Sequence, residues 1–111
     1  MIIALGDVYA QLPRVEAVRE LMRETQARAG EQPGCISYAF AQSLDDPAHF
    51  VLVQQWRDRE ALEEHYRSPA FANYQAQIAK QIVHTSELRL HEVQTSYALV
   101  DSSRLDLAQD D

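Results

Sequence analysis

The stretch CISYAFAQSLDDPAHFVLVQQWR (residues 35–57) contains the clearest indication of the fold class. Its first part, Cys35–Ser43, and its last part, His49–Arg57, alternate along the chain with a period of two, as β-strands do. Between them, Leu44-Asp45-Asp46-Pro47 has the composition of a hairpin connection. Two strands joined by so few residues run antiparallel and lie side by side. This stretch therefore predicts a β-hairpin.

Both strands of the hairpin carry apolar side chains on each face. In the first strand the larger side chains Ile36, Tyr38 and Phe40 are expected on one face, and the small side chains, including that of Cys35, on the other. In the second strand the even-numbered residues from 50 to 56 share one face and the valines lie on the opposite one. A sheet built on this hairpin has two faces to cover.

Five further elements flank the hairpin. They are a strand over Met1–Ala10, a helix from Pro13 to Gly30, a short helix capped by Asp58, a helix from Ser68-Pro69 to about Val83 with a stripe of Phe71, Tyr74, Ile78 and Ile82, and a strand over Glu87–Val100. Proline at the first helical position and Asp or Ser before it are typical helix starts. The order β-α-β-β-α-β predicts an α+β, ferredoxin-like sandwich with both helical segments on one face of the sheet.

The second face of this sheet predicts a homodimer. Two helical segments cover only one face, and the other would expose a contiguous apolar patch larger than monomers usually carry. A second copy could cover that patch by packing sheet against sheet around a two-fold axis. We expect a closed, face-to-face dimer.

Composition limits the classes of function. The chain has 111 residues and a formal charge of −7, which suits one domain (residues 1–100) followed by an acidic tail (101–111). The acidic balance argues against nucleic-acid binding, and no apolar run is long enough for a membrane span. The single cysteine excludes an intrachain disulfide and a multi-cysteine zinc site. A cytoplasmic protein is expected.

The residue pattern alone indicates one small apolar pocket with a titratable group. Trp56 ends the hairpin, His65 lies on the short helix and Tyr74 on the next one. A histidine beside aromatic rings could act as a general base. On pattern alone, however, Trp56 and Tyr74 suit the core better than a functional site, and His65 equally suits a structural hydrogen bond. No cofactor-binding motif is present, and the spacing of His84 and His91 gives no convincing metal site.

Several motifs resemble the antibiotic biosynthesis monooxygenase (ABM) family. They are Pro33-Gly34-Cys35 with Tyr38, the strand Phe50–Trp56 with Asp58, Ala61-Leu62 with His65, and Ser68-Pro69 with Phe71. The resemblance implies a dimeric α+β barrel, closest to the quinol monooxygenase-like branch. It implies a reaction without a cofactor, in which a base removes a substrate proton and the resulting anion reduces O₂. Trp56 and His65 match family positions.

The sequence also departs from the family pattern. Gln54 replaces a frequent glutamate, and Leu52 and Leu62 replace the asparagine and tyrosine of the anthrone oxygenases. Gln75 occupies the position of the iron-ligating histidine in haem-degrading members, so haem degradation is not expected. Ala70 stands where the isomerase-like branch often has histidine.

These observations lead to one functional hypothesis and two alternatives. The hypothesis is a homodimeric, cofactor-independent monooxygenase of a quinol or polycyclic phenol, with His65 as base and Trp56 as the orienting pocket wall. The residues expected to line the substrate are Tyr38, Leu52, Gln54, Phe71 and Tyr74. The alternatives are a non-catalytic barrel that binds a small aromatic ligand, and an isomerase of a small carbonyl compound that uses His65 as proton shuttle.

Overall fold

A computed structural model describes residues 1–85 and 87–99 of the chain. The elements along this part of the chain are β1 (Ile2–Ala10), a 3₁₀ turn η1 (Leu12–Arg14), α1 (Val15–Gly30), β2 (Cys35–Gln42), β3 (His49–Trp56), α2 (Arg59–Tyr66), α3 (Pro69–Ile78), β4 (Ile82–Thr85) and β5 (Arg89–Glu92). The expected acidic tail, 101–111, lies outside the described residues.

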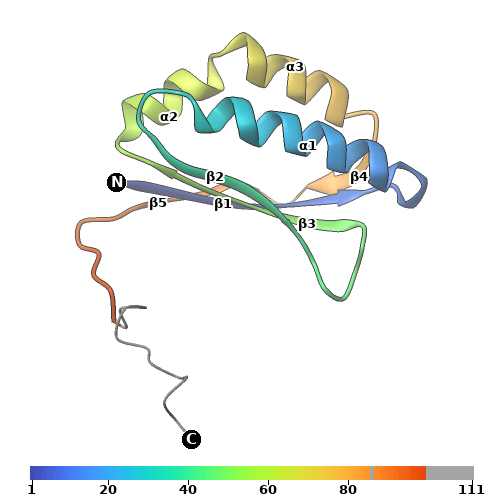
Figure 1. Ribbon diagram of the computed structural model, residues 1–111, viewed down its shortest axis with the longest axis horizontal. Coiled ribbons are helices and arrows are strands. Elements are labelled where there is room, and N and C mark those ends of the chain that lie inside the picture. Colours follow the sequence, from blue (N-terminus) through green and yellow to red (C-terminus); the bar gives the residue numbers. More distant parts are fainter. Residues whose placement is uncertain (86, 100–111) are drawn as a thin grey trace, which may run out of the picture.

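The strands form one antiparallel sheet in the order β2-β3-β1-β4, and β5 also pairs with β1. The three α-helices lie on the same side of this sheet (Figure 1). The predicted hairpin is the pair β2–β3, in which Tyr38 is opposite Gln54 and Phe40 opposite Leu52. The α+β, ferredoxin-like class predicted from the sequence is confirmed.

Local sequence explains where the second and third helices begin. The Asp58 carboxylate accepts a hydrogen bond from the Ala61 backbone N–H at 2.9 Å, which lowers the pKa of Asp58. The Ser68 hydroxyl accepts one from the Phe71 N–H at 3.2 Å, and Pro69 follows as the first helical residue. Both predicted helix caps are present.

The space between helices and sheet contains two packed clusters. One, under α1 and α3, includes Val18, Met22, Phe50 and Ile78. The other lies under α2, and its largest members are Tyr38, Leu52, Trp56 and Leu62. Gly34, with a φ of +83°, allows the close approach of α2 to the start of β2, because a Cβ there would lie 2.5 Å from that of Ala61.

The last part of the chain differs from the prediction. The expected helix to about Val83 ends at Ile78, and Ile82 begins strand β4 while still packing on the same core. Of the expected long strand over Glu87–Val100, the described residues form only the short strand β5, and β4 precedes that range. The two short strands pair with opposite ends of β1. The sequence predicts helix at Ile82 because this residue continues the apolar spacing of Phe71, Tyr74 and Ile78. Ile82 reaches the same core from strand β4, so the spacing alone does not distinguish helix from strand at this position.

Strand β2 also differs from simple alternation. The register shifts between Cys35 and Ser37, so that Cys35 is opposite Trp56 and Ser37 opposite Gln55. This bulge leaves Ile36 55% exposed and turns Cys35 toward the Trp56 cluster. The predicted faces of Ile36 and Cys35 are therefore wrong, whereas those of Tyr38 and Phe40 hold.

The side of the sheet away from the helices carries the remaining apolar residues. Leu5 is opposite Val53, which is opposite Ala39, and Val51 is opposite Ala41 in the neighbouring row. None of the α-helices covers this open face (Figure 1). No helix among the described residues is long and apolar enough to cross a bilayer.

Candidate functional site

His65 lies on the inward side of α2 inside a box of aromatic rings. The side chain is buried, and the rings of Tyr38, Trp56, Tyr66 and Phe71 have their centroids 5.0–5.1 Å from its own. Such surroundings provide packing contacts but few polar groups. The imidazole is therefore desolvated while it remains within a well-packed site.

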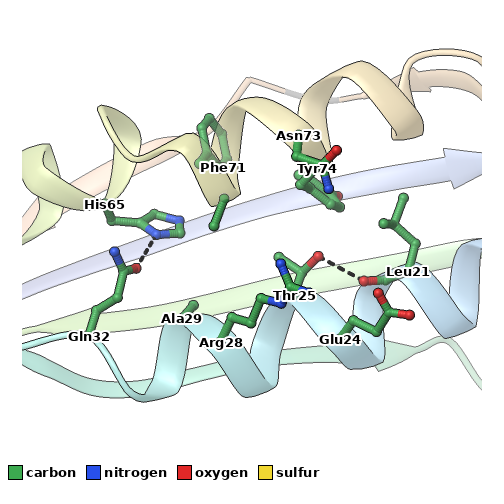
Figure 2. A pocket seen from close by; sticks show the side chains of 11 residues that line it. Leu21, Glu24, Thr25, Arg28, Ala29, Gln32, His65, Phe71, Asn73 and Tyr74 are labelled. Carbon is green, nitrogen blue, oxygen red and sulfur yellow. Dashed lines mark hydrogen bonds between the residues drawn. The ribbon is translucent and has the colours of Figure 1, made fainter.

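One ring nitrogen of His65 has a polar partner. His65 Nδ1 lies 2.6 Å from Gln32 Oε1, in the turn after α1 (Figure 2). The turn is fixed by its own backbone bonds, from the Gln32 N–H to Ala29 O and from the Cys35 N–H to Gln32 O. An amide oxygen only accepts hydrogen bonds, so His65 carries its proton on Nδ1 and a lone pair on Nε2.

The second ring nitrogen, Nε2, is buried and has no hydrogen-bond partner among the described residues. Burial disfavours the charged ring and lowers the pKa of His65 from its usual 6.5 to about 4. At neutral pH the ring is thus an uncharged acceptor of hydrogen bonds. This is the protonation state that a general base needs.

A cavity of about 80 Å³ adjoins His65 between α1 and α3 (Figure 2). We call it the α1–α3 cavity. Its wall includes Leu21, Arg28, Gln32, His65, Phe71 and Tyr74. Leu21 and the aromatic rings make it apolar, while Arg28 and Glu24 from α1 add charged groups to its lining.

A larger cavity of about 330 Å³ lies between α3 and the sheet, and we call it the α3–sheet cavity. Its wall includes Gly6, Leu52, Tyr66, Phe71, Tyr74 and Leu88. Phe71 and Tyr74 line both cavities and so form a shared wall. Burial raises the pKa of Tyr74 to about 12 and also raises that of Tyr66, so neither phenol is a base at neutral pH.

Trp56 and Gln54 lie behind these walls. Both are 0% exposed and neither lines the two cavities. The Trp56 indole N–H donates to Gln54 Oε1 at 2.8 Å, and Gln54 Nε2 donates to the Tyr66 hydroxyl oxygen at 2.9 Å. The two residues support the site and are not exposed to a substrate in this structure.

Tyr38 is also buried beneath His65. Its hydroxyl oxygen has no hydrogen-bond partner among the described residues, and burial raises the pKa of its phenol. Two unpartnered polar atoms, the Tyr38 hydroxyl and His65 Nε2, thus lie on adjacent rings whose centroids are 5.1 Å apart. Buried polar groups are rarely left without a partner, so this pair requires an explanation.

The structure divides the predicted site residues into three groups. His65, Phe71 and Tyr74 share the α1–α3 cavity, and Leu52 lines the α3–sheet cavity with the same two rings. The third group, Tyr38, Gln54 and Trp56, packs behind them. The sequence analysis did not identify Gln32 or Tyr66 as site residues. Gln32 is 33 residues from His65, and no pattern in the sequence links these two residues.

The open face carries a separate polar group. Tyr9 lies stacked between His49 and His84, with centroids 4.4 Å away on each side, and His49 Nε2 is 2.7 Å from Asp7 Oδ1. Among the described residues no cluster of three or more His, Cys, Asp or Glu side chains could hold a metal ion.

Comparisons with known sequences point to one family. A family model described as antibiotic biosynthesis monooxygenase matches residues 1–77. A protein of Mycobacterium tuberculosis, provisionally named as a monooxygenase, is 35% identical over 72 residues, which is 62% of this chain and 70% of the relative. An uncharacterised protein of Synechocystis is 22% identical over 88% of this chain and 67% of its own length.

Solved structures share the fold. A Deinococcus radiodurans protein, described provisionally as an antibiotic biosynthesis monooxygenase, has a TM-score of 0.85 at 18% identity and covers 91% of this chain and 100% of its own. The structure of Rv0793 from Mycobacterium tuberculosis has a TM-score of 0.79 at 23% identity, with 87% and 98% covered. At these identities the likeness concerns the fold.

Proposed function

The chain belongs to the antibiotic biosynthesis monooxygenase family, and we propose that it oxidises a small quinol with O₂, without a cofactor, using His65 as its base. One observation carries the proposal. The Nε2 lone pair of a neutral, buried histidine has no partner among the described residues, and the His65 side chain lines an aromatic-walled cavity.

The chemistry requires little from the protein beyond this base. Transfer of a phenolic proton to Nε2 leaves a phenolate, which is electron-rich enough to reduce O₂. One oxygen atom joins the ring and the other leaves as water, so all four electrons come from the quinol, which ends as a hydroxyquinone. The protein orients the ring and excludes water.

The neighbours of His65 support each stage of this proton transfer. Gln32 holds the proton on Nδ1 and so keeps Nε2 unprotonated. A phenolate formed beside the ring would stabilise the imidazolium that burial otherwise disfavours. Arg28, in the lining of the same cavity, could pair with the developing anion, while Glu24 in that lining carries the opposite charge.

The volume of the cavity limits the size of the substrate. The α1–α3 cavity, at about 80 Å³, is smaller than the roughly 150 Å³ cavity that holds benzene in an engineered protein core. A monocyclic quinol therefore needs a modest displacement of the lining side chains, and a polycyclic phenol needs a large one. Because Phe71 separates this cavity from the larger one, its rotation would join the two.

Oxygen consumption tests the proposal. Purified, metal-stripped protein is assayed against monocyclic and bicyclic hydroquinones, with His65→Ala and, as a matched control, His91→Ala on the exposed strand β5. We expect uptake above autoxidation for monocyclic quinols, lowered about 10²–10⁴-fold in His65→Ala and unchanged in the control. Phe71→Ala should extend activity to bicyclic quinols.

Other results would identify a different function. Unchanged uptake in His65→Ala would remove this residue from the reaction. Saturable binding of quinols without uptake would favour the non-catalytic binding barrel, in which Leu52 and Leu62 provide apolar contacts only. Product formed under strict anaerobiosis would favour an isomerase.

We also propose that the protein assembles as a homodimer through the open face. The rows Leu5–Val53–Ala39 and Val51–Ala41 place apolar side chains side by side across three strands, and Leu5 is 39% exposed. Val53→Lys would place a charge at the centre of this surface, whereas Leu44→Lys changes a fully exposed loop residue. Sedimentation should give twice the chain mass for the wild type and Leu44→Lys, and the chain mass for Val53→Lys. A monomeric wild type at micromolar concentration would contradict the proposal.

A further inference from the structure

We infer that Gln54 turns the Tyr66 hydroxyl into a hydrogen-bond donor toward the α3–sheet cavity, so that this cavity takes an apolar aromatic ligand carrying an acceptor oxygen, such as an aryl ketone or a quinone. The inference stands on the hydrogen bonds of Trp56, Gln54 and Tyr66. It does not depend on the role proposed for His65.

Trp56 sets the direction of this chain of hydrogen bonds. An indole N–H can only donate, so the atom of Gln54 that faces it at 2.8 Å must be the carbonyl oxygen. The amide nitrogen of Gln54 must then face Tyr66, 2.9 Å away. The usual ambiguity in orienting a glutamine amide is thus removed by its neighbour.

The consequence for Tyr66 follows from its single hydrogen. Its oxygen already accepts from Gln54 Nε2, so its own O–H must point away from Gln54. The structure shows no acceptor for this hydrogen among the described residues. Tyr66 lines the α3–sheet cavity, and its pKa is raised by burial, so the hydroxyl keeps its proton and remains a donor there.

A glutamate at position 54 would reverse this polarity. A carboxylate accepts but does not donate, so it would take hydrogen bonds from both the Trp56 indole and the Tyr66 hydroxyl. The cavity would then meet the lone pairs of Tyr66 instead of its hydrogen. Replacing an NH₂ group by an oxygen therefore decides whether the ligand must accept or donate.

The rest of the cavity suits a flat apolar ligand. Leu52 lies beneath it on β3, Phe71 and Tyr74 provide aromatic surface, and Leu88 packs over Gly6, where an added Cβ would lie 3.0 Å from the leucine Cδ1. The volume of about 330 Å³ is within the range of small-molecule sites. The wall is largely apolar, and the polar residues in it besides Tyr66 and Tyr74 are Asp7, Gln75 and Thr85.

A matched pair of ligands isolates this hydrogen bond. We would titrate the ¹⁵N-labelled full chain at pH 8 with 1-tetralone, which has one acceptor oxygen, and with tetralin, the same rings without it. The Trp56 indole N–H signal is unique because the chain has one tryptophan. The variants are Tyr66→Phe and Gln54→Glu, with Tyr97→Phe at an 81% exposed position as control.

The wild type and Tyr97→Phe should bind the ketone about two- to tenfold more tightly than the hydrocarbon, the usual worth of one hydrogen bond. The preference should fall to about one in Tyr66→Phe and in Gln54→Glu. Tyr66→Phe alone decides the matter if the buried carboxylate of Gln54→Glu prevents folding. A ketone preference that persists in Tyr66→Phe, or no binding of either ligand to the wild type, would overturn the inference. Loss of quinol turnover would leave it untouched.

Discussion

Polar residues on the two faces of the sheet differ in how deeply they are buried. On the helix-covered face, Gln54 and His65 are buried and each has partners that fix its orientation. On the open face, Asp7 and His49 form a pair that remains partly exposed. Gln54 and His49 both lie on β3, and their side chains point to opposite faces because side chains alternate along a strand. His65 packs over the face that carries Gln54. Burial therefore holds His65 in its neutral form.

Truncation should affect the two faces very differently. Trp56→Ala removes a fully buried ring and leaves Gln54 Oε1 unpaired, so we expect it to lower the free energy of unfolding by about 3–5 kcal/mol. Val53→Ala, on the half-buried open face, should cost about 1 kcal/mol or less in the separated chain. Urea unfolding followed by circular dichroism at one protein concentration measures both. Equal losses would mean that the faces are equally packed.

The pH dependence of stability should carry the signature of His65. Its pKa is about 4 when folded and near 6.5 when unfolded, so the unfolded chain binds the proton first. The stability that the neutral ring provides is complete above pH 6.5, falls as the pH drops from 6.5 to 4, and then stays constant. The loss is on the order of 3 kcal/mol. The difference between wild type and His65→Leu should change over this window, and a flat difference would contradict burial of a neutral ring.

Substitutions of Gln32 test whether its hydrogen bond from the turn after α1 controls the protonation and stability of the buried His65. Gln32→Leu leaves the His65 Nδ1–H without its acceptor and should destabilise the protein by about 1–2 kcal/mol. Gln32→Glu retains an acceptor at the same place and should raise the pKa of His65. Thermal unfolding and histidine NMR titration measure these effects. If Gln32→Leu had no effect on either, the bond would have no role.

The open-face pair should contribute least. Asp7→Asn keeps the shape and one acceptor oxygen beside His49, and we expect less than about 1 kcal/mol of destabilisation because the pair is partly solvated. Unfolding at low and high salt measures this contribution. A loss of stability as large as that of Gln32→Leu would show that the open face shields this pair from solvent as well as the covered face shields His65.

Local chemistry made much of the fold predictable. Asp58, Ser68 and Pro69 specify where helices begin through contacts within a few residues, and the alternation from Phe50 to Trp56 specifies the buried face of β3. The bulge at Ile36 could not be predicted, since it depends on how the turn through Gly34 joins the sheet. The end of α3 at Ile78 could not be predicted, because Ile82 continues the apolar spacing of the helix but packs on the same core from strand β4.

The site was less predictable than the fold. His65, Phe71 and Tyr74 were identified by residue type and motif, and they do line one cavity. The partners that give the site its chemistry come from distant positions: Gln32 sets the proton on His65, and Gln54 sets the hydroxyl of Tyr66. Hydrogen bonds across 33 and 12 residues depend on tertiary packing, which periodicity does not encode.

The protonation state of His65 can be measured directly by an NMR titration of its ring nitrogens in the ¹⁵N-labelled protein, assigned by comparison with His65→Leu. We expect a neutral ring at pH 7 with its proton on Nδ1, a lone pair on Nε2 and a pKa near 4. A proton on Nε2, or a pKa near the ordinary value of 6.5, would contradict this expectation.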